Sequence, residues 1–352
     1  MFQTDLYDWY LDQGQENRLL VIQSPYVVKY LERRFEDSLV IANLLWKHHG
    51  MAGNSLKAAQ VQVQLARSAY PLSLNERIEF LGRARANASS STLGTGRQAR
   101  QALLLEISEL LDIAGIQSDI LERLQEDERL QGDRKTAIVE KLNSDIQSLN
   151  ILYNEYADQA AYYDICLMIY QAAQHQNRTD ITDTWDALIR QTHLKCVTEE
   201  RLPWEGVANM VRTTAERLSL ASTTFPVIDL LPKLKKYDYE FQRDLGPQTW
   251  VVDCLIDAGV EFDTIFTILV DMLYNNETPF RGGNRYYIAD DILHVAQRWF
   301  QSSKRGTNIL FGSEQNARGV QETLTSLLSN GLSREKREDT QALVKNIDHY
   351  LR

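Results

Sequence analysis

Apolar residues recur at spacings of three and four along nearly the whole chain, in runs of helical length separated by short breaks. Segment 261–276 shows the pattern, because Phe262, Ile265, Phe266 and Leu269 fall on one continuous helical face. An α-helix returns such positions to the same side every 3.6 residues, whereas a half-buried strand alternates with a period of two. We find no convincing strand, so the sequence predicts an all-α protein.

Local signals mark where these helices begin and end. Ser73 and Glu76 form a capping box, in which each side chain satisfies a free backbone N–H of the first turn. Prolines at 25, 203 and 226 suit the first turn of a helix, and Gly50, Gly115, Gly259 and Gly331 suit helix ends.

The connections are short, so consecutive helices are expected to pack as antiparallel neighbours. From the residues alone two architectures stay open. One is an irregular α-solenoid of stacked antiparallel helices, and the other is a globular helical enzyme with a central cavity. We treat 1–352 as a single segment, with a flexible loop at 87–96 and a possible sub-break near 278–285.

The composition excludes several classes of protein. The formal net charge is −10, which repels phosphate backbones, so no nucleic acid is expected as a direct partner. Two groups of basic residues are interpreted as solvated faces. They are Arg77, Arg83, Arg85, Arg97 and Arg100, and Arg281, Arg285, Arg298, Lys304 and Arg305.

Targeting and cysteine signals point to the cytosol or nucleus. The opening MFQTDLYDWYLDQ has no basic start or apolar core, so it is not a signal peptide. The longest uncharged stretch, 165–177, is too short to span a bilayer. Cys166, Cys196 and Cys254 are far apart and lie in apolar helical patterns, which predicts buried thiols in a reducing compartment rather than zinc ligands or disulfides.

Catalytic chemistry is hard to find in this sequence. Asp290, Asp291 and His294 in ADDILH form the best candidate set for an all-α enzyme. The fifth position of a DDxxD metal motif is occupied by His294, and no second acidic motif follows, so the two aspartates are interpreted as a solvated first helical turn. We therefore expect no catalytic, cofactor-binding or metal-binding residues and no cofactor.

Aromatic residues are the better candidates for binding. Tyrosine and tryptophan are enriched at protein interfaces, and several here could line a groove that accepts a peptide. The alternative for most of them is packing between helices. The candidate peptide-binding residues are Tyr153, Tyr156, Tyr163, Tyr170, Tyr286, Tyr287 and Trp299.

Several blocks resemble a known family. These are LYDWYL (6–11), SPYVVKYLE (24–32), LLWKHHG (44–50), LARSAYPLSLNERIEFLGRARANA (65–88) and LNILYNEYA (149–157). They resemble the C-terminal region of the scaffold nucleoporins of the 155/157/170-kilodalton class, which build the inner ring of the nuclear pore complex. The quoted blocks cover about the first 160 residues, and the remainder is similar in helical texture.

The resemblance implies an α-solenoid without enzymatic activity, located at the nuclear pore and nuclear envelope. It implies partners among the other nucleoporins, above all linker segments from the non-repeat portion of an FG nucleoporin. In this family the membrane-contacting elements belong to an N-terminal β-propeller, so no membrane contact is expected of this chain. A role in nucleocytoplasmic transport, including protein and mRNA transport, follows from that location.

The resemblance also implies a preceding helix, so we expect an exposed apolar end of the solenoid at Tyr7, Trp9 and Tyr10. Two other hypotheses stay open. A helical scaffold of a vesicle-coat or tethering complex would share the same texture, and an all-α enzyme would use the aspartates and histidine of ADDILH.

Overall fold

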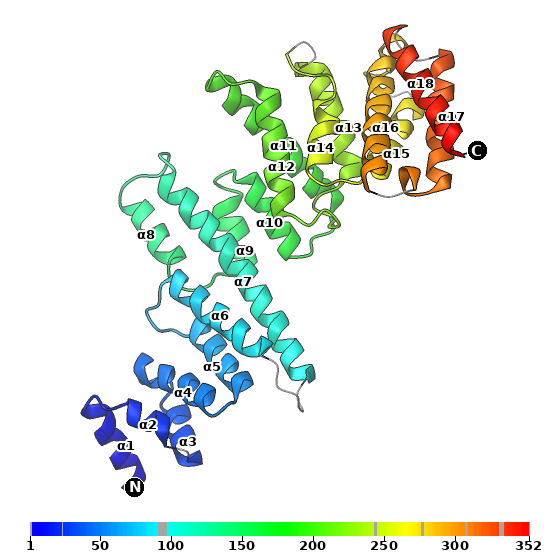
Figure 1. Ribbon diagram of the computed structural model, residues 1–352. Coiled ribbons are helices and arrows are strands. Elements are labelled where there is room, and N and C mark those ends of the chain that lie inside the picture. The colour runs from blue at the N-terminus through cyan, green and yellow to red at the C-terminus, as the bar shows by residue number, and fades with distance from the viewer. Residues whose placement is uncertain are drawn as a thin grey trace. The chain divides into compact units, whose positions relative to one another are not determined.

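The computed structural model describes residues 2–22, 24–90, 97–242, 245–275, 278–306, 309–330 and 334–351. These residues form helices and connections, and no strand occurs among them. The chain divides into two compact units, 1–173 and 174–352. The predicted all-α class is confirmed, and within each unit helices that follow one another in the sequence pack together, as in an α-solenoid (Figure 1). That 1–352 is a single segment stays a prediction.

The first unit contains ten α-helices and one π-helical segment in its described residues. They are α1 (Phe2–Asp12), α2 (Asn17–Val21), α3 (Pro25–Arg33), α4 (Leu39–Met51), α5 (Ser55–Arg67), α6 (Leu74–Ser89), α7 (Arg97–Glu126), α8 (Asp133–Leu142), α9 (Leu149–Ile151), η1 (Leu152–Ala157) and α10 (Tyr163–Ala172). Helices α4 to α7 each pack against the next, and η1 and α10 return against α7.

The second unit is also built from helices that pack against their neighbours in the sequence. Its elements are α11 (Arg178–Thr198), α12 (Pro203–Arg217), α13 (Val227–Tyr237), η2 (Asp238–Gln242), α14 (Trp250–Asp257), α15 (Phe262–Asn275), η3 (Gly282–Arg285), α16 (Tyr286–Gly306), η4 (Leu310–Gly312), α17 (Glu314–Asn330) and α18 (Arg334–Leu351). Helix α11 pairs with α12, α15 with α16, and α17 with α18. Helix α13 contacts α11, α14 and α15, which makes the stacking irregular.

Several predicted helix ends are confirmed, whereas Gly50 lies inside α4 and Gly331 lies outside the described residues. Ser73 accepts from the Glu76 N–H at 3.3 Å while the Glu76 carboxylate accepts from the Ser73 N–H at 2.8 Å, so the capping box is complete. Pro25 and Pro203 occupy the first turns of α3 and α12. Gly259 has a φ of +92° just after α14, a backbone conformation that glycine adopts without a steric penalty.

Gly115 was expected to end a helix, and this expectation is wrong. Helix α7 runs through it for 30 residues. A buried stripe at Leu103, Ile107, Leu110 and Ala114 continues beyond the glycine to Leu121 and Leu124. Packing of that stripe outweighs the roughly 1 kcal/mol by which glycine weakens a helix interior.

The loop expected at 87–96 is shorter at its start. Helix α6 extends through Ser89, and the Asn87 side chain donates to Gln62 Oε1 at 2.9 Å while Ala88 is fully buried. Residues 91–96 lie outside the described part of the chain. The sub-break near 278–285 falls between α15 and α16, where η3 forms its last residues.

Arg77 lies in the core, which corrects its assignment to a solvated basic face. Its side chain is 1% exposed and donates to the carbonyl oxygens of Ala66, Ser68 and Tyr70 at 2.8–3.0 Å. It also reaches Asp145 Oδ1 at 2.7 Å. Arg77 thereby holds the turn between α5 and α6, whose carbonyls have no helical partner there. The three cysteines are buried and free, as predicted.

Candidate functional site

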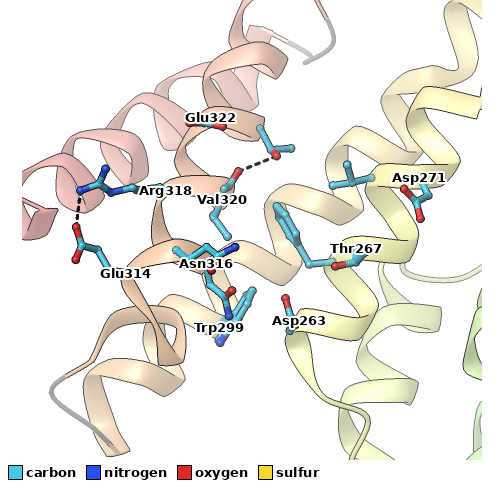
Figure 2. A pocket seen from close by; sticks show the side chains of 14 residues that line it. Asp263, Thr267, Asp271, Trp299, Glu314, Asn316, Arg318, Val320 and Glu322 are labelled. Atoms are coloured by element: carbon cyan, nitrogen blue, oxygen red, sulfur yellow. Dashed lines mark hydrogen bonds and ion pairs between the residues drawn. The ribbon is translucent and has the colours of Figure 1, made fainter.

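A groove lies between α15 and α17 in the second unit, with a volume of about 750 Å³ (Figure 2). Both walls are single helices whose polar residues recur every fourth position. On α15 these are Asp263, Thr267 and Asp271, and on α17 the stripe begins at Glu314 and passes through Arg318 to Glu322. Because residues four apart share a helical face, each wall presents one row of polar side chains to the groove.

The floor of the groove is apolar and rigidly packed. It is formed by Phe266 and Val270 of α15, Trp299 of α16 and Val320 of α17. The Trp299 ring stacks on Phe262 with an interplanar angle of 8°. It also meets Phe311 edge to face at 5.0 Å. These contacts fix the indole, so a ligand would meet a preformed surface.

Carboxylates dominate the charge of this groove. Four acidic side chains line it, and the basic lining residue, Arg318, is paired with Glu314 at 2.5 Å. The four acidic side chains are exposed to solvent. The groove can therefore hold a cationic group at its walls and an apolar group on its floor.

The aromatic residues predicted to bind a peptide do not come together. Trp299 lines the α15/α17 groove. Tyr287 is buried against Tyr239 with ring centres 5.3 Å apart, and the half-buried Tyr286 packs on Tyr287 at 4.4 Å. Neither of these tyrosines is among the residues that line the groove.

The other four lie in the first unit. Tyr153 and Tyr170 share a hydrogen bond between their hydroxyls at 2.7 Å, and burial raises the Tyr153 pKa well above its ordinary value. Tyr156 is 6% exposed and borders a small hollow of about 310 Å³ beside α7 and α8. Tyr163 opens α10 and is half-buried. Tyr156, Tyr170 and Tyr287 are thus covered by neighbouring helices, which fits packing rather than an open peptide groove.

The expected exposed end is also only partly exposed. Trp9 is 49% exposed, whereas Tyr7 is 5% exposed because it packs against Tyr30 with ring centres 5.2 Å apart. Tyr10 is half-buried beneath Arg18. Tyr7 is therefore a core residue of the first unit, which corrects its assignment to exposed surface.

Asp290 and Asp291 are buried, which corrects their interpretation as a solvated helical turn. Asp291 is fully buried and lies 2.8 Å from Lys235 Nζ of α13. Asp290 is 5% exposed and lies 2.8 Å from Lys336 Nζ of α18. Asp238 is a third buried carboxylate, 3.2 Å from Lys235. We call these five residues the charge cluster, and it joins α13, α16 and α18.

The three residues considered for an all-α enzyme, Asp290, Asp291 and His294, do not converge on one point. His294 bonds to Asp253 Oδ1 at 2.7 Å, apart from the partners of Asp290 and Asp291. The residues proposed for an all-α enzyme therefore have three separate sets of partners. No group of three or more potential metal ligands occurs among the residues that the structure describes.

The surroundings of Asp291 perturb its pKa. Burial raises the pKa of this carboxyl to about 6, because desolvation and the nearby Asp238 outweigh the attraction of Lys235. The Lys235 pKa is also raised, because two carboxylates share this one ammonium against the cost of its burial. One cation cannot fully compensate both anions.

This shift predicts a pH-dependent stability. Between about pH 4 and 6 the native state holds a proton on Asp291 that the unfolded chain has released, so stability falls as the pH rises through this window. Relative to the Asp291→Asn variant, the unsubstituted protein should lose about 2 kcal/mol of unfolding free energy from pH 4 to pH 7. Urea unfolding of both proteins across this range measures the difference, and parallel pH profiles would contradict the prediction.

The groove residues that matter most, Asp263, Asp271, Glu314 and Glu322, were not among the candidates from the sequence. The signal was present as carboxylates spaced eight apart on each helix. That these two rows face each other depends on how α15 and α17 pack, which no local pattern encodes. None of the helices in the described residues is both long and apolar enough to cross a bilayer.

This chain is similar to known nucleoporins. Residues 1–337 match the family described as "Non-repetitive/WGA-negative nucleoporin C-terminal". Nucleoporin NUP170 of Chaetomium thermophilum is 35% identical over 367 residues, covering 97% of this chain and 26% of its own length. Probable nucleoporin C890.06 of Schizosaccharomyces pombe is 30% identical over 308 residues, covering 87% and 23% respectively. The chain thus spans about a quarter of the length of these relatives.

Solved nucleoporin structures are similar to this chain as well. The crystal structure of the Chaetomium thermophilum Nup170 CTD–Nup145N complex matches with a TM-score of 0.86 and 34% identity, covering 100% of this chain and 71% of that chain. A structure of the Chaetomium thermophilum Nup170 CTD matches with a TM-score of 0.84 and 33% identity, covering 99% and 71%.

Proposed function

This chain belongs to the non-repetitive/WGA-negative nucleoporin C-terminal family, and from that premise we propose that it is a scaffold segment of the nuclear pore inner ring that binds a linear segment of another nucleoporin. One observation carries the proposal. A relative whose fold covers this whole chain was crystallised in a complex named for Nup145N, a second nucleoporin.

The fold suits this role. A stack of helices has a large surface for its mass and offers grooves between neighbouring helices along its length. A disordered linker can bind such a surface by placing a few side chains between helices, although it loses conformational entropy in doing so. The α15/α17 groove, with its preformed apolar floor, is a candidate site of this kind.

The proposal extends to location and partners. We place the protein at the nuclear pore complex in the nuclear envelope, where it would support nucleocytoplasmic transport. With a net charge of −10 it is proposed to contact neither nucleic acid nor anionic membrane surfaces directly. A vesicle-coat or tethering role is not favoured, because the family match is to nucleoporins.

We also propose that the chain is not an enzyme. The family relationship implies a structural role. The separate partners of Asp290, Asp291 and His294 support it, since a catalytic set must converge on one reacting atom.

The partner proposal is tested by binding. Isothermal titration of residues 1–352 with the non-repeat linker of the cognate FG nucleoporin should give saturable heat with one site. The same linker with its residues in scrambled order is the control. An absence of heat at high micromolar concentration would mean that this chain does not bind the linker.

A further inference from the structure

The acidic walls of the α15/α17 groove indicate which kind of segment it can hold. Asp263 and Asp271 of α15 and Glu314 and Glu322 of α17 are among the residues that line it (Figure 2). Four carboxylates against the single guanidinium of Arg318 leave a formal charge of 1 − 4 = −3 on the lining. Charges of one sign that face each other across a groove focus the potential and attract the opposite sign.

The groove also has room for a backbone to approach one wall closely. Gly319 is an exposed residue of α17 on that wall, and a Cβ built on it would meet no other atom within 4 Å. Thr267 and Asn316 on opposite walls supply side-chain groups that can hydrogen-bond an extended backbone. Below them lies the packed indole of Trp299.

We infer that this groove binds an extended peptide segment whose Lys or Arg side chains flank an apolar residue. The cationic groups meet the carboxylates of the two walls, and the apolar residue lies over the Trp299 floor between them. This inference rests on the proposed function, because it assigns a site and a chemistry to the linear segment of the partner nucleoporin.

The other large hollow does not show such a preference. It lies in the first unit beside α3, α4 and α5, with a volume of about 1170 Å³. Its charged lining residues are of both signs, as acidic Glu32, Glu36 and Asp37 alternate with basic Arg33, Lys57 and Arg67. Charge complementarity therefore favours the α15/α17 groove for a cationic segment.

The test uses residues 1–352 and overlapping synthetic peptides that tile the non-repeat linker of the cognate FG nucleoporin. Binding is measured by fluorescence anisotropy of the labelled peptides at low and high salt. The tile that binds best should carry net positive charge beside an apolar residue. Its affinity should fall at least about tenfold between low and high salt, because exposed charges are screened.

Two groove variants test the site, one by changing its charge and the other by filling its space. The charge reversal Asp263→Lys/Asp271→Lys should weaken the bound tile at least about tenfold. Gly319→Leu should weaken binding of the same peptide at least about tenfold, because the leucine side chain fills the space beside α17. Leucine is a better helix former than glycine, so this variant should keep its fold. The matched control is Asp183→Lys/Glu216→Lys, which reverses two exposed charges on α11 and α12 away from the groove and should bind like the native protein.

The outcomes separate the two proposals. If no tile binds the native protein, the proposed function itself is wrong for this chain. If a tile binds but both groove variants retain native affinity, the linker binds elsewhere and only the groove inference is wrong. A best tile that is acidic or uncharged would overturn the assigned chemistry, and so would an affinity that does not change with salt.

Discussion

Lys235→Ala should lower the unfolding free energy of the second unit by about 3–5 kcal/mol. Lys235 is 1% exposed, and its ammonium lies between the carboxylates of Asp291 and Asp238 at 2.8 and 3.2 Å. It also donates to the Gln248 carbonyl oxygen at 3.2 Å. Removing the cation leaves two carboxylates buried side by side without compensation, which costs far more than the loss of an exposed ion pair.

Urea unfolding followed by circular dichroism measures the loss, and hydrogen exchange locates it in α13 and α16. Lys345→Ala is the matched control, because this lysine is exposed on α18 and its substitution should change stability by about 0.5 kcal/mol or less. The double substitution Lys235→Met/Asp291→Leu should recover part of the loss, since it also removes one of the two carboxylates left without a counterion. A Lys235→Ala protein as stable as the control would show that water reaches the cluster.

Arg77→Leu should destabilise the first unit by about 3 kcal/mol. Leucine fills part of the volume but donates no hydrogen bond, so the carbonyl oxygens of Ala66, Ser68 and Tyr70 lose their shared donor. Loss of the ion pair with Asp145 contributes less to the destabilisation, because the Asp145 carboxylate is 67% exposed and can be hydrated. Arg77→Lys should recover only part of the loss, because an ammonium cannot reproduce the fork of the guanidinium.

Thermal unfolding of the three proteins gives the comparison. Arg83→Leu on the same helix is the control, since Arg83 is 53% exposed, pairs with the exposed Glu79 at 3.1 Å and lies over the Phe80 ring. Its effect should be about 0.5 kcal/mol or less. Equal midpoints for Arg77→Leu and Arg83→Leu would mean that the turn between α5 and α6 is held without Arg77.

Helices were predictable from this sequence because their determinants are local. The capping box at Ser73 and Glu76 and the proline at 25 act within one turn of the chain, and the structure contains both as expected. Gly115 failed as a stop signal because the stripe that continues through it is stabilised by packing against other helices. Local rules therefore succeed until tertiary contacts oppose them.

The burial of polar side chains was not predictable, because it depends on residues that are far apart in the sequence. Arg77 and Asp291 look like ordinary exposed residues on helices, and their partners lie on distant parts of the chain, at Asp145 and Lys235. The same holds for the groove. The spacing of Asp263 and Asp271 shows that they share a helical face, but only the packing of α15 and α17 against α16 brings them to the same groove as Glu314 and Glu322.

The pairing of Lys336 with Asp290 has a consequence for the modularity of this fold. A helical array whose repeats contact only their neighbours can in principle be shortened by whole repeats, leaving a sound remainder. Removing α18 here would take away the counterion of a carboxylate that is 5% exposed on α16, as well as the apolar cover of α17. Helix α18 therefore stabilises both α16 and α17, so deleting α18 alone should destabilise the helices that remain in the second unit.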